Sequence, residues 1–161
     1  MTHWTTLTGA GALVVDDRRM LLVQQRRPYG VHWEFPSGYY ESGESFEQTA
    51  AREVLEETAV PVEIRDLLCT MVWERTNDRR RNVLAFFLAV PLDTGAKPRP
   101  QFEEDIDDAA FLDPRALDPG ELHPLNQAVL DRWAADDPRP FHLHVDVSVN
   151  PDGTQSYAVR P

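Results

Sequence analysis

The sequence predicts an α/β domain in which strands precede and follow a central amphipathic helix. Short apolar runs bounded by polar turns recur on both sides of residues 45–59, and within that stretch apolar residues return at helical spacing. The chain has 161 residues, of which 42% are hydrophobic and 27% charged, so it can bury a compact core. We expect a single domain over residues 1–161, with a core at about 5–135 and a C-terminal β-hairpin at 140–160.

The overall charge narrows the classes of partner. A net charge of −11 argues against a non-specific nucleic-acid binder and against a binder of anionic membranes, because both need a positive surface. No apolar run approaches the length of a membrane span, and the first residues lack the pattern of a signal peptide. The single cysteine, Cys69, excludes an internal disulfide and fits a reducing compartment. We expect a cytoplasmic protein without nucleic-acid or membrane partners.

Short strands are expected before the helix. Residues 10–15 and 20–24 read as a hairpin around a polar turn, and residues 31–35 read as a short strand that ends at Pro36. Arg27 follows the second strand, where it can reach a substrate phosphate or simply lie in solvent. Trp33 is a candidate to stack on a nucleobase, although aromatic residues at such positions commonly belong to the core.

The central helix is predicted from its two ends and its apolar side. Ser45 followed by Gln48 is a capping-box pattern, and Pro61 indicates that the helix has ended. The apolar residues expected to seat the helix on a sheet are Phe46, Ala50, Ala51, Val54 and Leu55.

Three carboxylates crowd the last turns of this helix. Glu53 and Glu57 lie one above the other, and Glu56 lies about a sixth of a turn away. Like charges at this spacing cost about 0.2–0.5 kcal/mol per pair, and the end of a helix favours cations. A bound divalent cation reverses both penalties, because Mg²⁺ prefers carboxylate oxygens. A solvated acidic face is the alternative interpretation.

Strands and two charged loops are expected after the helix. Residues 62–74 contain at least one strand, and the apolar run 83–90 suits a strand buried on both faces. The basic segment between them, with Arg79 and Arg81, is either a solvated hairpin tip or a phosphate clamp. The acidic segment 102–108, with Glu103 and Glu104, is either a solvated turn or the source of a further carboxylate for a metal.

The rest of the chain predicts a strand, a helix and a hairpin. Residues 109–112 read as a strand and residues 124–135 as a helix. Residues 141–149 and 154–159 read as two strands around a strong turn signal. His142 and His144 share one face of the first strand, either as a metal-binding pair or as exposed histidines. The hairpin can extend the main sheet, cover a cleft, or pair with another subunit in a homodimer.

Residues 38–60 resemble the Nudix box, G-x5-E-x7-R-E-U-x-E-E-x-G-U, where U is bulky and aliphatic. The matching positions are Gly38, Glu44, Arg52, Glu53, Val54, Glu56, Glu57 and Val60. The preceding Trp33–Ser37 also resembles the usual lead-in of this family. Ala59 replaces the last glycine of the box, and a left-handed backbone there would cost alanine about 1 kcal/mol. Ser37 replaces a lead-in glycine; neither change removes a metal ligand.

The resemblance implies an α/β/α sandwich with a central mixed β-sheet, and Mg²⁺- or Mn²⁺-dependent hydrolysis. Glu53, Glu56 and Glu57 would bind the metal, or one of them would act as base, and the carbonyl of Gly38 would be a further ligand. Arg52 and Glu44 would brace the loop against the helix. The family often takes a general base or an extra ligand from a later loop, which implies Glu103 as ligand or Glu104 as catalytic residue. Arg27, Trp33, Arg79 and Arg81 are the candidate substrate-binding residues.

The same resemblance implies a substrate of the nucleotide type, a nucleoside diphosphate linked to another moiety. Small size and the lead-in favour a nucleoside triphosphate pyrophosphohydrolase. An ADP-ribose or nucleotide-sugar hydrolase is the alternative among enzymes, and residues 74–78 carry neither the proline nor the tyrosine that mark two of the subfamilies. Two further hypotheses are a nucleotide-binding regulatory module without turnover and an acidic structural domain that binds no metal.

Overall fold

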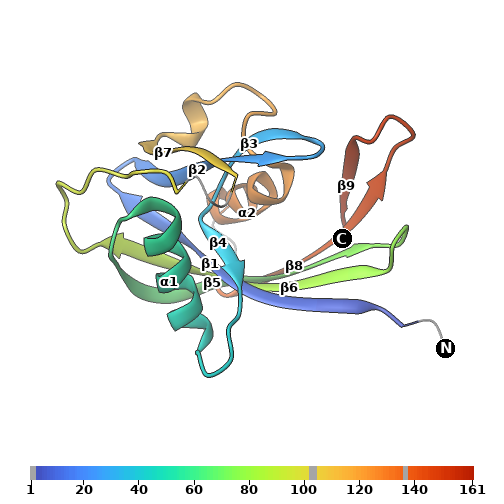
Figure 1. The fold of residues 1–161 in the computed structure, drawn as a ribbon, viewed down its shortest axis with the longest axis horizontal. Coiled ribbons are helices and arrows are strands. Elements are labelled where there is room, and N and C mark those ends of the chain that lie inside the picture. Colours follow the sequence, from blue (N-terminus) through green and yellow to red (C-terminus); the bar gives the residue numbers. More distant parts are fainter. Residues whose placement is uncertain (1–2, 102–104, 136–137) are drawn as a thin grey trace.

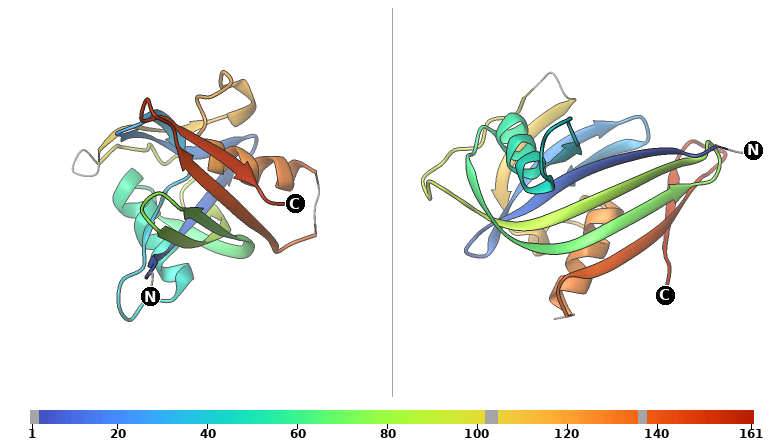
Figure 2. Two further views of the ribbon diagram at one scale, coloured as in Figure 1. Left: turned by 90° about the vertical axis from the view of Figure 1, so that its right-hand side faces the viewer. Right: turned by 90° about the horizontal axis from the view of Figure 1, so that it is seen from below.

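The computed structural model describes residues 3–101, 105–135 and 138–161. One curved, mixed β-sheet forms its centre, and helix α1 (Phe46–Thr58) and helix α2 (Pro124–Ala134) lie on opposite faces of it (Figures 1 and 2). The predicted α/β class and mixed sheet are confirmed. In the described part of the chain, no helix is long and apolar enough to span a membrane.

The sheet is built around the first strand. Its order is β3-β2-β1-β6-β5-β8-β9, with β4 paired to β1 and β7 paired to β2. The strands are β1 (Thr5–Asp16), β2 (Arg19–Arg27), β3 (Gly30–Glu34), β4 (Ser37–Tyr39), β5 (Val62–Arg75), β6 (Arg80–Pro91), β7 (Ile106–Leu112), β8 (Phe141–Val149) and β9 (Gln155–Val159). The pairs β1–β6 and β5–β8 are parallel, and the others are antiparallel. Strand β6 begins three residues earlier than expected, so Arg81 belongs to a strand rather than to a hairpin tip.

Helix α1 begins and ends as the sequence predicts. The Ser45 side chain accepts a hydrogen bond from the backbone of Gln48, whose side chain accepts one from the backbone of Ser45, so the capping box is confirmed. Ala59 ends the helix in the left-handed region, with φ 60° and ψ 18°, and its N–H donates to the carbonyl of Leu55. The chain therefore places an alanine where glycine is the residue without steric cost.

The buried stripe of α1 differs from the predicted one. Ala50 and Val54 are fully buried against the sheet, but Phe46 is 41% exposed and Leu55 is 48% exposed. The stripe instead includes Thr49, Glu53, Glu57 and Thr58. Apolar periodicity alone missed this rotation because the two glutamates on the buried side are charged. Two carboxylates of the helix thus face the protein and not the solvent.

Helix α2 packs on the opposite face of the sheet, in the largest apolar cluster. Val129 is fully buried there, and Leu125, Leu130 and Trp133 pack against the same cluster. The strand residues of this cluster include Met71, Leu84 and Phe86. We call this side of the sheet the α2 face and the other side the α1 face.

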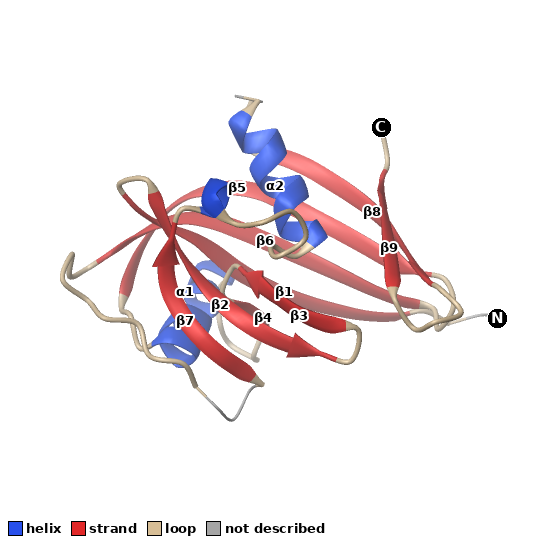
Figure 3. Ribbon diagram, turned by 90° about the horizontal axis from the view of Figure 1, so that it is seen from above, coloured by secondary structure: helices blue, strands red, loops and turns tan. Residues whose placement is uncertain are grey.

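The C-terminal hairpin extends the main sheet. Strand β8 runs parallel to β5, from the pair Cys69 with Phe141 to the pair Arg75 with Val147, and β9 returns alongside β8 (Figure 3). Alternation predicts that five apolar residues of β8 share one face; Phe141, Leu143, Val145 and Val147 are buried there, whereas Val149 is 38% exposed. The hairpin is therefore a structural continuation of the sheet.

Candidate active site

Arg52 holds the acidic loop against α1. Its Nε and Nη2 donate to the two carboxylate oxygens of Glu44, at 2.6 and 3.1 Å. Nη1 donates to Glu53 at 2.8 Å and to Glu56 at 3.1 Å, and Nη2 also donates to the Tyr39 carbonyl at 2.9 Å. The predicted pairing of Arg52 with Glu44 is present in this geometry. One guanidinium thus fixes the positions of three carboxylates, in the bidentate manner that suits arginine.

Glu53 and Glu57 are the buried acids of the site. They are 7% and 4% exposed, and they lie one helical turn apart on the side of α1 that faces the lead-in loop. The backbone N–H of Ser37 donates to Oε2 of Glu57 at 3.1 Å. A β-carbon at Gly38 would lie 2.1 Å from the carboxyl carbon of Glu53. Glycine at this position is therefore what lets the loop and the carboxylate approach each other.

Arg52 favours the charged form of the Glu44 carboxylate. The hydrogen bonds from Arg52 lower the pKa of the Glu44 carboxyl to about 2. Its bonds to Glu44, opposed by desolvation, raise the pKa of Arg52 itself. Arg52 forms ion pairs with Glu41, Glu44, Glu53 and Glu56. One arginine among so many carboxylates leaves a strong negative field around α1.

This donor set fits a hard divalent cation. Carboxylate oxygens are the ligands that Mg²⁺ prefers, and Glu53, Glu56 and Glu57 come together at one end of α1. Because Gly38 has no β-carbon, the loop backbone can lie directly against the Glu53 carboxylate at that end of the helix. Glu103 and Glu104 lie outside the described residues, so their predicted roles stay predictions.

The predicted substrate-binding residues lie in three different environments. Arg27 donates to both carboxylate oxygens of Glu34, at 3.1 and 2.7 Å, on the strands next to the lead-in loop. Trp33 packs against the apolar cluster on the α2 face. Arg79 is an exposed turn residue with φ 54°. Arg81 lies on the α1 face, where it contacts Glu74 at 2.5 Å and the ring of Trp4. Their roles in binding stay predictions.

Arg80 is the residue of this segment that the structure brings next to the loop, and Asn82 lies on the same face of β6. Arg80 pairs with Arg75 across the sheet, and Asn82 pairs with Trp73. Trp73 belongs to the cluster on the α2 face, so Asn82 points to that face as well. Nη2 of Arg80 donates to the Tyr39 hydroxyl at 2.8 Å. Strand alternation counted from Trp73 would have indicated this face, had the start of β6 been predicted at residue 80.

A buried histidine connects α2 to the C-terminal hairpin. His123 is 4% exposed and caps α2, because its Nδ1 accepts the backbone N–H of Leu125 at 3.2 Å. A neutral ring with Nδ1 as acceptor carries its proton on Nε2, and Nε2 lies 3.2 Å from the Tyr157 hydroxyl. Burial lowers the pKa of His123 to about 4, so the ring is neutral at pH 7. Sequence reasoning missed this contact between distant segments.

A second acidic group lies on the α1 face of β5 and β8. Glu74, His144 and Asp146 bring three possible metal-ligand atoms within 4.8 Å of one another. Arg160 contacts Glu74 at 3.0 Å and Asp146 at 2.6 Å, and Arg81 also contacts Glu74. Two arginines already offset the two carboxylates. The group is therefore explained as an ion-pair network that ties β9 and the segment after it to the sheet.

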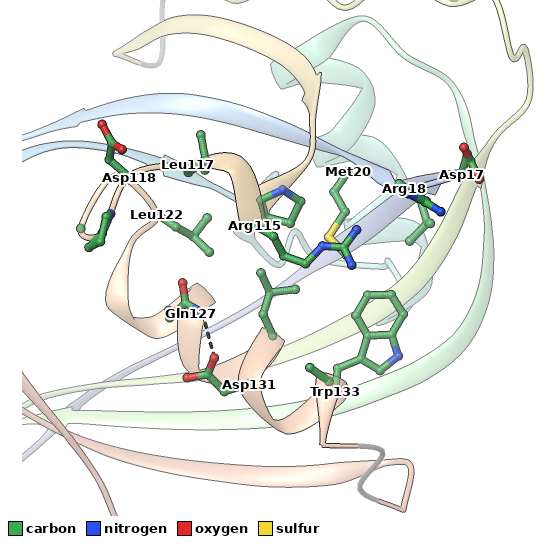
Figure 4. Close-up of a pocket in the computed structure, with 16 residues that line it drawn as sticks. Asp17, Arg18, Met20, Arg115, Leu117, Asp118, Leu122, Gln127, Asp131 and Trp133 are labelled. Atoms are coloured by element: carbon green, nitrogen blue, oxygen red, sulfur yellow. Dashed lines mark hydrogen bonds between the residues drawn. The ribbon is translucent and has the colours of Figure 1, made fainter.

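A large apolar pocket lies apart from the acids. It has a volume of about 830 Å³ and opens between the β1–β2 turn, the loop after β7 and α2 (Figure 4). Met20 and Leu122 are buried residues of its lining. Three aspartates and two arginines also line it, so it has no excess of positive charge for a phosphate chain; they are Asp17, Asp118, Asp131, Arg18 and Arg115. We therefore locate the candidate active site at α1 and the lead-in loop.

Fold and site together define an α/β protein with one acid-bearing helix held against a glycine-containing loop. The model of the NUDIX domain matches residues 5–133, and the chain belongs to the Nudix family. The chain is 45% identical over 67 residues to mouse nucleoside diphosphate-linked moiety X motif 6, a match that covers 42% of this chain and 21% of that protein. The chain thus spans about a fifth of the length of this relative.

Solved structures show the same fold. A NUDIX hydrolase from Nitrosomonas europaea superimposes with a TM-score of 0.70 at 22% identity, covering 90% of this chain and 81% of that one. A MutT NUDIX hydrolase from Burkholderia pseudomallei superimposes with a TM-score of 0.69 at 25% identity, covering 79% and 97%. The predicted family and fold are confirmed.

Proposed function

We propose that the protein is a divalent-metal-dependent pyrophosphohydrolase. Its substrate class is a nucleoside diphosphate linked to another moiety, with nucleoside triphosphates as the first candidates. The observation that carries the proposal is that Arg52 holds Glu53 and Glu56 beside the backbone of Gly38, while the N–H of Ser37 holds Glu57. Carboxylates grouped at the end of a helix repel one another and the helix dipole, so they do not stabilise the helix. They suit a cation that binds an anionic diphosphate.

The acids of α1 would hold Mg²⁺ or Mn²⁺, together with the carbonyl of Gly38. When bound, the ion offsets the negative charge of the diphosphate and makes water a better nucleophile. Arg52 keeps Glu53 and Glu56 in fixed orientations through its hydrogen bonds. The N–H of Ser37 does the same for Glu57, because it donates to Oε2 of that carboxylate.

Arg27 is the arginine that we propose for the substrate phosphates. Its pKa is raised: desolvation opposes the charged form, but the hydrogen bond and charge of Glu34 outweigh it, and Glu57 adds to the effect. The guanidinium is held by Glu34, which lies three residues before Ser37, whose N–H contacts Glu57. A charged arginine beside the carboxylates can contact a diphosphate that the acids alone would repel. A cytoplasmic location, which the single buried Cys69 fits, is part of the proposal.

Phosphate release from a panel of substrates tests the proposed function. Nucleoside triphosphates, ADP-ribose, nucleotide sugars and dinucleoside polyphosphates are incubated with the protein and Mg²⁺ or Mn²⁺, with a coupled pyrophosphatase or phosphatase. We expect Glu57→Gln to lose at least about a hundredfold in kcat, because it removes one charged acid of the site. Glu63→Gln, on the exposed part of β5, is the matched control and keeps full activity. Equal activity of Glu57→Gln and the parent would contradict the assignment.

A further inference from the structure

Two buried polar atoms on β6 have no hydrogen-bond partner. Across residues 3–101, 105–135 and 138–161, three buried side-chain polar atoms lack one, and two of them are Nε of Arg80 and Oδ1 of Asn82. Asn82 as a whole is only 6% exposed. Buried polar groups are paired in more than about nine cases of ten, and an unpaired one costs about 1–3 kcal/mol. Two such groups, two residues apart on one strand, therefore require an explanation.

The two groups point in the same direction. Residues 80 and 82 are two apart on a strand, so their side chains project from the same face. Asn82 is directly opposite Trp73 of β5, and Arg80 is directly opposite Arg75. Trp73 packs on the α2 face, so all four side chains lie on that face. Arg81, between the two, points to the other face and meets Glu74 there.

One tyrosine connects this group to the candidate active site. The Tyr39 hydroxyl accepts a hydrogen bond from Nη2 of Arg80 at 2.8 Å, and the Tyr39 carbonyl accepts one from Arg52 at 2.9 Å. Tyr39 directly follows Gly38 in the chain. Arg80, one of the two residues with an unpaired atom, is therefore in direct contact with the loop that faces the acids of α1. Tyr39 is 47% exposed, so its ring can move away from Arg80 without disturbing the core.

The chemistry of the group matches a nucleobase. Arg80 offers an unused N–H donor, and the Asn82 carboxamide offers an unused acceptor. Trp73, directly opposite Asn82 on β5, offers an indole ring, whose centroid lies 5.9 Å from the Arg75 guanidinium carbon. Each base presents acceptors and N–H donors along its edges, and its ring can stack on an aromatic side chain. A simple sugar or a phosphate offers neither an aromatic ring nor an N–H donor.

We propose that Asn82, Arg80 and Trp73 form the subsite that binds the nucleobase of the substrate, with Asn82 as the specificity-determining residue. The proposal rests on the proposed function, because it names the part of the substrate that lies beyond the diphosphate. The base fills the unpaired positions of Asn82 and Arg80 and takes over the contact that Tyr39 makes with Arg80.

Binding of nucleoside monophosphates tests the subsite independently of turnover. AMP, GMP, CMP and UMP are titrated calorimetrically, with ribose 5-phosphate as the probe that lacks a base. We expect at least one nucleotide to bind at least about tenfold more tightly than ribose 5-phosphate, and Asn82→Leu to remove that preference. The same variant should keep or raise Tm, because it removes an unpaired buried group. Thr70→Val, a similar change on the α1 face of β5, is the matched control and should leave nucleotide binding unchanged.

Each outcome separates the subsite from the proposed function. If nucleotides and ribose 5-phosphate bind equally, or if Asn82→Leu binds nucleotides as well as the parent does, the subsite is refuted. A lower Tm of Asn82→Leu together with equal losses for all ligands would show a structural role for Asn82 and would also refute it. Base-dependent binding without hydrolysis of any substrate would support the subsite and overturn the proposed function. Hydrolysis of a substrate without any base-dependent binding would support the proposed function and refute the subsite.

Discussion

Replacing Ala59 by glycine should stabilise the protein. Ala59 has φ 60° and ψ 18°, and the left-handed region costs an L-residue about 1–2 kcal/mol because the β-carbon crowds the following carbonyl. Glycine removes that cost but has more freedom in the unfolded chain, which takes back about 0.4–1 kcal/mol. The net gain is about 0.5–1 kcal/mol. For a chain of this size it corresponds to a rise in Tm of about 1–4 °C.

Thermal and urea unfolding measure this gain. Both are carried out in EDTA, because a bound metal would add to the apparent stability. Ala51→Gly, inside the same helix, is the matched control and should lower stability by about 1 kcal/mol, since no left-handed geometry is relieved there. Opposite signs for the two glycine variants are the expected result. If Ala59→Gly lowers Tm as much as Ala51→Gly does, the steric reasoning is refuted.

Three further predictions concern the site and α2. Arg52→Lys should lower activity about 10–100-fold, because an ammonium cannot reproduce the fork of hydrogen bonds. Circular dichroism should show that the fold is retained. Unchanged activity would show that Arg52 does not brace the site. Gly38→Ala should weaken Mn²⁺ binding at least about tenfold in calorimetry, because its β-carbon would lie 2.1 Å from the Glu53 carboxyl carbon; unaltered affinity would show that the loop can move away. The unfolding free energy should fall by up to about 3 kcal/mol as the pH is lowered from 6.5 to about 4, because burial depresses the pKa of His123 and only the unfolded state takes up the proton in that range. His123→Asn, which caps without titrating, should flatten this dependence in urea titrations at several pH values, and an equally steep profile would assign it to other groups.

Local sequence signals predicted the ends of the elements well. The capping box at Ser45 and the strained helix end at Ala59 depend only on neighbouring residues, so the sequence contains all the information they need. The same holds for the alternation of the tail strand, whose Phe141 and Leu143 are buried. The short strand β4 was missed because its three residues become a strand only by pairing with β1.

Contacts between distant segments could not be predicted in this way. The buried side of α1 includes Glu53 because the lead-in loop packs on it, and this depends on the path of residues 36–40. The faces of Arg80 and Asn82 depend on their register against β5. Tyr157 meets His123 only because the hairpin joins the sheet beside β5. These features follow from tertiary packing, which outweighs local preference.

The position of β1 has a consequence for the order in which the chain assembles. β1 pairs in parallel with β6, and the strands β2 to β5 and helix α1 lie between them in the chain. A growing chain therefore carries β1 with one edge unpaired until residues 80–91 have been made. Pairings over such long separations form slowly and leave strand edges open to aggregation. The β1–β2 hairpin can form early, whereas the central β1–β6 pair needs β6 and the β5–β8 pair needs β8. The central pairing of this sheet can thus form only after the strands β2 to β5 and helix α1 have been made.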